Sequence, residues 1–469
     1  MSKAESFDLV VLGAGPGGYT AAIHAAQLGL SVAIVEKDTR LGGTCLLRGC
    51  IPTKALLHSA DLYEEIQHGT EHGIIAKEIS LAFDKVMARK DKIVQVNAKG
   101  VEFLMRKNKI SVFNGYGRLD GKRKLVVELA GGERKTIEFK NIIIATGSVP
   151  RSLPGLTIDG KRIVTSDEIL QLQQIPKSMI VLGSGAVGSE FASIFHRFGV
   201  DVTLVELLPR ILPIEDEESS EAVEKAFKKQ GIKVHTGMKL GNIQVTADGV
   251  TADGVSDSGE TTRFEAEMLL VAVGRKPVTE NIGLEEAGVT LDRGYVQVDG
   301  FMRTSQAGIY AIGDVVPTPW LAHVASHEGI VAGDHMAGKH AHPIDYERGV
   351  PGVTFCSPEV GSIGLTEKKA IEQGFDVKCG RFPWMASGKA KILGNTTGFV
   401  KVVTDKTYGE VLGVHIVGPA ATELIAAAGI AISHEATAES IFNTIHAHPT
   451  LSEAVMEAAG DAIGYAISF

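Results

Sequence analysis

The 469-residue sequence has little of what marks several classes of protein. It contains only four cysteines, too few for a fold held together by disulfides. Its apolar runs are far shorter than the ~18–20 residues that a membrane-spanning helix needs. Acidic residues outnumber basic ones, 56 Asp and Glu against 47 Lys and Arg. Because no basic stretch is interleaved with aromatic residues, we expect no nucleic acid partner.

The start of the chain also lacks a targeting signal. Met1 to Ser6 is short and polar, and a strand pattern follows at once, which leaves no room for the charged and apolar regions of a signal peptide. We therefore expect a cytoplasmic protein, or one of the mitochondrial matrix if a transit peptide has been removed.

Glycine is abundant, with 54 residues among 469, against a usual share of ~7%. This abundance predicts many tight turns or close approaches of the backbone to a ligand. At ~150 residues per domain, the length predicts roughly three domains.

A first glycine-rich turn follows an apolar strand over residues 7–12. Gly13, Gly15 and Gly18 lead into a helical stretch, and a second strand ends at Glu36. Strand, glycine turn, helix, strand and acid are typical of a dinucleotide-binding βαβ unit. In such a unit the glycines let the backbone approach a pyrophosphate at the helix N-terminus, and the acid accepts hydrogen bonds from a ribose.

The same arrangement recurs after an apolar strand over residues 179–182. Here the glycines are Gly183, Gly185 and Gly188, and the acid is Glu206. The acid follows the first glycine by 23 residues in both copies (36 − 13 and 206 − 183). Two matching copies indicate two dinucleotide sites. An acid at 206 would repel a 2′-phosphate, so the second site should prefer NAD over NADP.

A second internal repeat supports the duplication. One apolar strand ends in Gly147 and Pro150, and another ends in Gly274 and Pro277. These strands would return the chain from each nucleotide-binding domain. The final ~120 residues mix strands with alanine-rich helices, which is typical of an α+β domain. We predict an α/β protein with two Rossmann-like domains and a C-terminal α+β domain.

Cys45 and Cys50 lie in the most informative stretch, residues 42–54. Two cysteines this close, beside a nucleotide site, suit a disulfide that opens and closes during turnover. The alternative is a metal site, which would need further Cys or His ligands at suitable spacing. Cys356 and Cys379 offer neither CxxC nor HxxxH spacing. We expect no metal, and we interpret these two as half-buried thiols.

These motifs, with Gly313-Asp314 and the segment HAHPTLSE at 446–453, resemble the class I pyridine nucleotide-disulfide oxidoreductases, and among them the dihydrolipoamide dehydrogenases. The resemblance runs from about residue 7 to the end. It implies an FAD-binding domain with the redox disulfide (1–148), an NAD-binding domain (149–276), a central domain completing the FAD site (277–346) and a dimerisation domain (347–469). It also implies a homodimer.

The resemblance implies site residues one by one. It implies catalytic roles for Cys45, Cys50, Lys54, Glu190, His448 and Glu453. It implies FAD contacts for Gly13, Gly15, Gly18, Glu36, Lys37, Gly43, Thr44, Lys54, Gly117, Ala145, Thr146, Gly147, Asp314, Leu321, Ala322 and His323. It implies NAD contacts for Gly183, Gly185, Gly188, Glu190, Glu206 and Gly274.

The implied reaction is the oxidation of dihydrolipoamide with reduction of NAD⁺. Cys45 would exchange with the substrate, Cys50 would contact the flavin, and Lys54 would pair with Glu190. His448, oriented by Glu453, would be the base that forms the attacking thiolate, because free His titrates near pH ~6.5. Implied partners are lipoyl domains of 2-oxo acid dehydrogenase or glycine cleavage complexes.

Some features depart from the family or stay open. Leu47 and Arg48 stand where Asn-Val is frequent; Arg48 either lowers a thiolate pKa or points to solvent, and we favour solvent. The acidic run 215–218 should be a solvated first helix turn. Alternative functions are reduction of another low-molecular-weight disulfide, or a non-catalytic nucleotide-binding subunit. The presence of both redox cysteines and of His448 argues against the second alternative.

Overall fold

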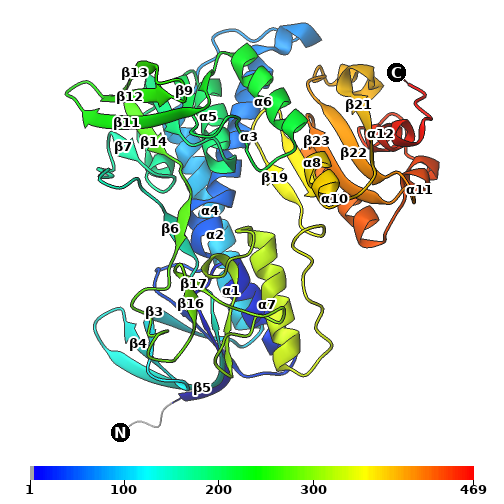
Figure 1. Ribbon diagram of the computed structural model, residues 1–469. Helices are drawn as coiled ribbons and strands as arrows, with labels where there is room; N and C mark the ends of the chain where they lie inside the picture. Colours follow the sequence, from blue (N-terminus) through cyan, green and yellow to red (C-terminus); the bar gives the residue numbers. More distant parts are fainter. Residues whose placement is uncertain (1–4, 469) are drawn as a thin grey trace. The chain divides into compact units, whose positions relative to one another are not determined.

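A computed structural model describes residues 5–468, which divide into two units (Figure 1). Unit 1 comprises residues up to Ala55, Lys85–Arg151 and Arg275–Ile344. Unit 2 comprises Leu56–Asp84, Ser152–Gly274 and residues from Asp345 onward. The chain crosses between the units several times, so neither unit is one continuous segment. The boundaries predicted at 148, 276 and 346 stay predictions.

The sheet of unit 1 contains the first predicted βαβ unit. β1 (Glu5–Leu12) pairs in parallel with β2 (Val32–Glu36) and with β5 (Arg134–Ile144). β5 pairs in parallel with β18 (Ile309–Ala311), and β2 with β3 (Ser111–Leu119). β4 (Lys124–Leu129) is antiparallel to β3 and β5. The parallel strands β1, β2 and β5 contain continuous buried apolar runs at residues 9–12, 32–35 and 142–144, because both faces of the sheet are covered there.

Helix α1 (Pro16–Gln27) follows β1 and packs along α7 (Ala322–Met336) (Figure 1). Small residues allow the close approach: a Cβ on Gly329 would stand 2.9 Å from the carbonyl oxygen of Gly17. His24 and Asp334 join the two helices at 2.8 Å. The other helices that begin or lie mainly in this unit are α2 (Gly43–Arg48), α3 (Cys50–Gln67) and α4 (Phe83–Lys107).

Short strands complete unit 1. β6 (Ser148–Pro150) and β15 (Arg275–Pro277) form an antiparallel pair, so the two strand ends that repeat in the sequence lie side by side. β16 (Leu291–Asp292) pairs with β17 (Tyr295–Val296). A 3₁₀ turn, η3 (Gly313–Val315), follows β18.

Unit 2 contains the second predicted βαβ unit. Its parallel sheet has the order β10–β9–β8–β14–β7, and α5 (Ala186–Arg197) connects β8 to β9. The strand bounds are β7 (Ile163–Val164), β8 (Ser178–Leu182), β9 (Asp201–Val205), β10 (Lys233–His235) and β14 (Met268–Val271). An antiparallel sheet of β11 (Met238–Val245), β12 (Val250–Ser256) and β13 (Thr261–Ala266) is inserted before β14.

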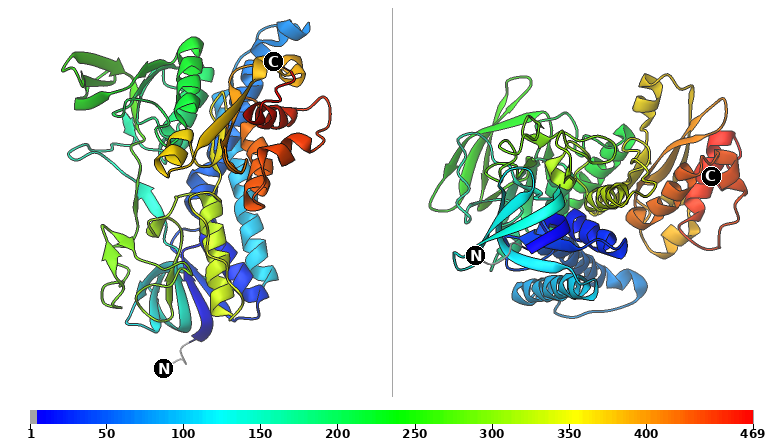
Figure 2. Two further views of the ribbon diagram at one scale, coloured as in Figure 1. Left: turned by 45° about the vertical axis from the view of Figure 1, so that its right-hand side comes forward. Right: turned by 90° about the horizontal axis from the view of Figure 1, so that it is seen from below.

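The C-terminal part of unit 2 is an antiparallel sheet with helices, as predicted for an α+β domain. The sheet order is β19–β20–β23–β22–β21 (Figure 2, yellow to orange). Its strands are β19 (Gly352–Thr354), β20 (Val360–Gly364), β21 (Val377–Pro383), β22 (Phe399–Asp405) and β23 (Val411–Val417). Its helices are α8 (Glu367–Glu372), α9 (Gly388–Ile392), α10 (Ala421–Ser433), α11 (Ala438–Asn443) and α12 (Glu453–Ile463). The predicted fold class is confirmed.

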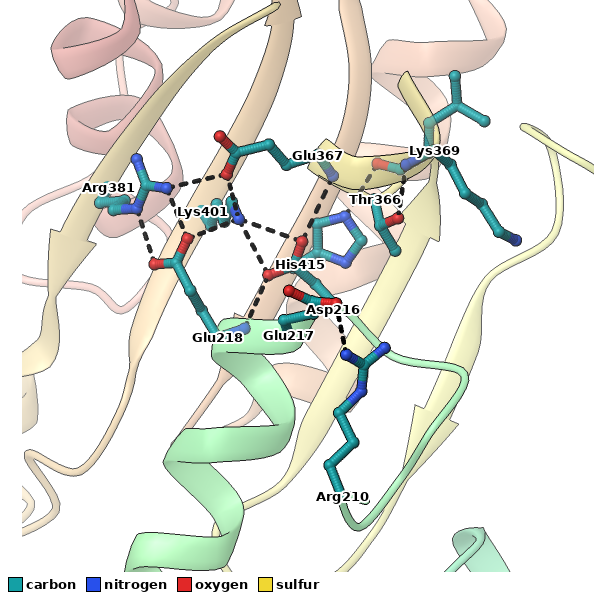
Figure 3. A network of polar contacts seen from close by, with 11 residues as sticks. Arg210, Asp216, Glu217, Glu218, Thr366, Glu367, Lys369, Arg381, Lys401 and His415 are labelled. Carbon is teal, nitrogen blue, oxygen red and sulfur yellow. Dashed lines mark hydrogen bonds and ion pairs between the residues drawn. The ribbon is translucent and has the colours of Figure 1, made fainter. Parts of the chain in front are cut away.

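Alternate residues of β22 serve its two faces, as the two-residue period of a strand requires. Val400 and Val402 belong to an apolar core with residues of α10 and α12. Lys401 therefore points to the opposite face, where its side chain is 2% exposed. Its ammonium is 3.0 Å from Asp216, 2.7 Å from Glu218 and 2.8 Å from Glu367 (Figure 3).

This cluster makes one prediction wrong. The acidic run 215–218 does begin a helix, α6 (Glu217–Gln230), with Asp216 as its N-cap. However, Glu215 and Asp216 are buried, and Arg381 joins Lys401 in neutralising Glu218 (Figure 3). The acids hold α6 to the C-terminal sheet because buried charges need partners of opposite sign.

Among residues 5–468, no helix combines the length and the apolar character required to cross a membrane.

Candidate active site

The first glycine turn has the tight packing that its sequence predicts. Gly13 has a φ of +107°, and a Cβ there would stand 2.2 Å from the carbonyl oxygen of Ala145. A Cβ on Gly18 would stand 2.0 Å from the carbonyl oxygen of Gly13. No other residue fits at either place, so α1 starts directly behind β1 with its N-terminus facing the turn, as a pyrophosphate site requires.

Glu36 ends β2 beside this turn and is buried. Its carboxylate accepts hydrogen bonds from the backbone N–H of Ala14 at 2.8 Å and of Asp38 at 2.9 Å. Burial raises the pKa of Glu36, although both N–H groups favour the charged form. The acid predicted to bind a ribose is thus held in place by the loop itself.

The stretch that contains both cysteines, residues 42–54, is called the redox loop here, and it lies directly on the first glycine turn. Cys45 lies in α2 and Cys50 begins α3, and the two form a disulfide with their Cα atoms 4.7 Å apart. Gly43 has a φ of +59°, and a Cβ there would stand 2.5 Å from the Cα of Gly15. Gly42 donates to the carbonyl oxygen of Ala14 at 2.9 Å. The predicted disulfide is therefore formed and sits against the predicted FAD turn.

Other predicted FAD contacts gather at the carboxyl ends of β1, β5 and β18. Asp314 lies in η3 just after β18 and accepts a hydrogen bond from Ser148. Thr146 follows β5 and donates to the carbonyl oxygen of Val278 at 2.6 Å. Leu321 is the N-cap of α7, and Ala322 is its first residue. Ligands of open α/β sheets bind at such strand ends.

These residues fit an FAD. Three places lack the space for a side chain because backbone must pass there, namely Gly13, Gly18 and Gly43. On Gly117 in β3, a Cβ would stand 2.5 Å from the Leu12 side chain. Unit 1 also contains the buried Glu36, Asp314 after β18, and the N-terminus of α1. A dinucleotide with a flavin end requires groups of these kinds in one unit.

Two further residues of unit 1 were missed from the sequence. Arg275 donates to the hydroxyl of Ser148 at 2.7 Å and to the hydroxyl of Thr44 at 3.4 Å. It therefore links α2, which contains Thr44, to Ser148, the residue that donates to Asp314. Glu328, fully buried in α7, accepts from the backbone N–H of Gly313 at 2.6 Å. The basic residue after Gly274 was a signal for the first; an acid among the small and apolar residues of α7 was a signal for the second.

Arg48 does not simply point to solvent. It forms an ion pair with Asp38, and their side chains are 33% and 21% exposed. The prediction that Arg48 points to solvent was therefore wrong. Its partner could not be read from the local sequence, because Asp38 lies ten residues earlier in the chain.

The second glycine turn repeats the geometry of the first. Gly183 has a φ of +97°, and a Cβ there would stand 2.5 Å from the carbonyl oxygen of Ala272. Glu206 is buried and accepts from the backbone N–H and the hydroxyl of Ser184, both at 2.7 Å. Around Gly185 and Gly274, by contrast, an added Cβ would meet no described residue within 4 Å apart from its neighbours along the chain. This turn is shaped for a dinucleotide and is open.

Lys54 and Glu190 lie in different units. Lys54 is in α3 and half-buried. Glu190 is buried in α5 and accepts from the backbone N–H of Phe355 at 3.0 Å. Their predicted pairing stays a prediction.

His448 and Glu453 form the predicted pair. Nδ1 of His448 lies 2.9 Å from Oε1 of Glu453, and the imidazole is 80% exposed. The other carboxylate oxygen accepts from the backbone N–H of Thr450 at 2.7 Å. Burial raises the pKa of Glu453, but the bonds from Thr450 and His448 outweigh it and lower the pKa. A carboxylate bonded to Nδ1 leaves Nε2 of the exposed His448 imidazole available to a proton donor or acceptor.

Burial favours the thiol form of the two remaining cysteines. Cys356 is fully buried, not half-buried as predicted, and burial raises the pKa of its thiol. Burial also raises the pKa of Cys379 to about 12. Within residues 5–468, no group of three or more His, Cys, Asp and Glu side chains could hold a metal ion.

Comparison with known proteins identifies the family of this chain. Residues 7–329 match the family model described as pyridine nucleotide-disulphide oxidoreductase. Residues 350–459 match the dimerisation domain of the same family. The chain therefore belongs to the pyridine nucleotide-disulphide oxidoreductases, and the predicted resemblance is confirmed.

Individual relatives cover nearly the whole chain. Dihydrolipoyl dehydrogenase of Bacillus subtilis is 47% identical over 99% of this chain and 100% of its own length. Mitochondrial dihydrolipoyl dehydrogenase of Pisum sativum is 42% identical over 98% of this chain and 92% of its own length. Among solved structures, LpdA of Mycobacterium tuberculosis has a TM-score of 0.89 at 29% identity, over 97% of this chain and 99% of that one.

Proposed function

We propose that this chain oxidises dihydrolipoamide, carried on proteins as dihydrolipoyl groups, to lipoamide and reduces NAD⁺ to NADH. The observation that carries the proposal is the Cys45–Cys50 disulfide seated on the first glycine turn. Full-length relatives that bear the name dihydrolipoyl dehydrogenase support the choice of substrate.

Unit 1 would hold FAD, through the first glycine turn, Glu36, Thr146 and Asp314. Bound FAD supplies two-electron transfer between a dithiol and a nicotinamide. The second glycine turn with Glu206 would hold NAD. Its openness suits a nucleotide that enters and leaves in each cycle, whereas the redox loop covers the first turn.

The side chains of the chain itself handle the sulfur chemistry. Nε2 of His448 takes the proton from a substrate thiol, because the thiolate is the form that attacks a disulfide. Glu453 fixes the tautomer of His448 and stabilises the imidazolium that forms. The thiolate bonds to Cys45 while the sulfur of Cys50 leaves with the electron pair of the broken bond. The second substrate thiol then displaces Cys45, which completes lipoamide and leaves both cysteines reduced.

We infer a homodimer in which His448 of one subunit serves the disulfide of the other, supported by the match to the dimerisation domain of the family. The lipoyl domains that deliver the substrate would belong to 2-oxo acid dehydrogenase or glycine cleavage complexes. The enzyme would work beside them, in the cytoplasm or the mitochondrial matrix.

The test is an anaerobic titration of the purified protein with dihydrolipoamide, followed by NAD⁺ and, separately, NADP⁺. We expect flavin absorbance, a long-wavelength band on reduction, and formation of NADH but not NADPH. Cys45→Ser should abolish the reaction, and the matched Cys379→Ser should retain it. Reduction by NADH but not by dihydrolipoamide would instead indicate another disulfide substrate. A protein that binds no FAD would contradict the proposal.

A further inference from the structure

Arg48 places a positive charge inside the redox loop. It is the last residue of α2, three positions after Cys45 and two before Cys50. Residues three apart in a helix share a face, with Cβ atoms ~5–6 Å apart. A cation so placed would stabilise a thiolate on either sulfur, which lowers the pKa of the thiol and favours the reduced state.

The structure places an anion opposite this cation. Asp38 accepts from the Arg48 guanidinium and, on its other oxygen, from Lys37 at 2.8 Å. Burial raises the pKa of Asp38, but the hydrogen bonds from Lys37 and Arg48 outweigh it and lower the pKa. Asp38 is therefore ionised at neutral pH. Its pairing with Arg48 is partly shielded from water, which limits screening by salt.

The backbone fixes Asp38 where it is. Its N–H donates to Glu36 at 2.9 Å, and its carbonyl oxygen accepts from Asn114 at 3.4 Å. Because Glu36 is itself bonded to the first glycine turn, Asp38 is anchored outside the redox loop. The guanidinium of Arg48 extends to Asp38, and the carboxylate partly cancels its positive charge.

We propose that Asp38 sets the reduction potential of the Cys45–Cys50 pair by neutralising Arg48. Reduction of the disulfide takes up two electrons and breaks the S–S bond, and the two sulfurs take up protons to the extent that their pKa values dictate. With less of its charge cancelled, the guanidinium would stabilise the thiolate more and make the dithiol a weaker reductant. Asp38 keeps it reducing enough to supply electrons to NAD⁺, so this inference rests on the proposed function for its purpose.

The experiment equilibrates the holoenzyme anaerobically with mixtures of reduced and oxidised dithiothreitol. In each exchange the reagent loses two electrons and closes its own S–S bond as the protein disulfide opens. Alkylation and mass spectrometry then measure the reduced fraction of the peptide that holds both cysteines. No dihydrolipoamide is used, so a wrong substrate assignment would not affect the outcome.

The variants form a cycle with opposite expected signs. Asp38→Asn should favour the dithiol about threefold to tenfold, which is about 14–30 mV for a two-electron couple. The double variant Asp38→Asn with Arg48→Gln should return to within about twofold of the parent. Asp38→Glu, which keeps the charge, should behave like the parent, as should Asp120→Asn at an exposed position of the same unit.

Two results would overturn the proposal. One is an unchanged equilibrium in Asp38→Asn. The other is a double variant that keeps the shift of Asp38→Asn, because Asp38 would then act without Arg48. Should Asp38→Asn not fold, Arg48→Glu decides, since it leaves Asp38 in place and should shift the equilibrium toward the disulfide. An Arg48→Glu equilibrium equal to that of the parent contradicts the proposal.

Discussion

The two glycine turns share one local geometry and differ in what surrounds them. In each, the first glycine has a positive φ and approaches a carbonyl oxygen that a Cβ would strike, at Ala145 in one and Ala272 in the other. In each, the acid 22 residues after the second motif residue accepts the backbone N–H of that residue, Glu36 from Ala14 and Glu206 from Ser184. The motif therefore determines the local shape of a dinucleotide-binding turn, but not what packs against that turn.

The surroundings decide how the turn is used. Gly43 of the redox loop packs against Gly15 of the first turn, whereas an added Cβ on Gly185 of the second turn meets nothing within 4 Å. A covered turn suits a cofactor that stays, and an open turn suits one that exchanges. Under the proposed function, the same sequence pattern would serve retention of FAD in one unit and exchange of NAD in the other.

The largest expected difference between the two turns is the difference between the effects of Gly43→Val and Gly185→Ala. At Gly43, a side chain would have to occupy a left-handed φ and a place 2.5 Å from backbone that cannot move. We expect loss of FAD and of much of the stability of unit 1, measured by flavin absorbance and thermal unfolding. Gly185→Ala should fold and keep FAD but raise the KM for NAD⁺, since its Cβ stands where a pyrophosphate approaches. Equal FAD content in both variants would refute the distinction.

His448→Gln tests a residue outside both turns. Removing a general base costs about 10²–10⁴-fold in rate, so kcat with dihydrolipoamide should fall by that order. FAD content and the KM for NAD⁺ should stay near those of the parent. The matched variant is His446→Gln, which removes a half-buried imidazole bonded to the Thr444 carbonyl. A similar loss in His446→Gln would show that the segment, and not the base, matters.

The paired variants Glu36→Gln and Glu206→Gln sharpen the comparison between the two nucleotides. A hydrogen bond to a charged group contributes about 1.5–3 kcal/mol. Glu206→Gln should therefore raise the KM for NAD⁺ about tenfold or more with kcat little changed, and Glu36→Gln should instead weaken retention of FAD. Steady-state kinetics and flavin release on dilution measure the two effects. A variant that weakened the binding of FAD and of NAD⁺ equally would contradict the assignment of one acid to each nucleotide.

The smallest effect concerns acid stability in unit 2. The Arg381 guanidinium lowers the pKa of Glu218 to about 2, with help from Lys401 and against the cost of burial. Because the folded pKa lies below the unfolded one, the stabilisation is complete above about pH 4.5 and is lost as the pH falls toward 2. Glu218→Gln should be less stable than the parent at pH 7 and converge with it near pH 2. Thermal unfolding across this range checks the sign, with the exposed Glu221→Gln as control.

Much of the fold and part of the site follow from the sequence for local reasons. Glycine spacing and the terminal acids encode both βαβ units within about 25 residues each, so periodicity suffices. Roles for Cys50, His448 and Glu453 came only with the family resemblance, because five residues across a turn carry no helical spacing. Lys401 and Arg275 were missed since their partners are distant; Asp216 lies 185 positions before Lys401. A lysine amid the valines of β22 was the available signal.

The Lys401 cluster has a consequence for how this chain can vary over evolution. A single neutral substitution at Lys401 leaves the buried Asp216 short of a partner, and a single loss of Glu218 or Glu367 takes a partner from both Lys401 and Arg381. Each step alone is unfavourable, while joint replacement by apolar residues of similar volume is tolerated in other proteins. We expect these positions to change together among descendants of one ancestor, while Glu217 at the exposed edge drifts freely.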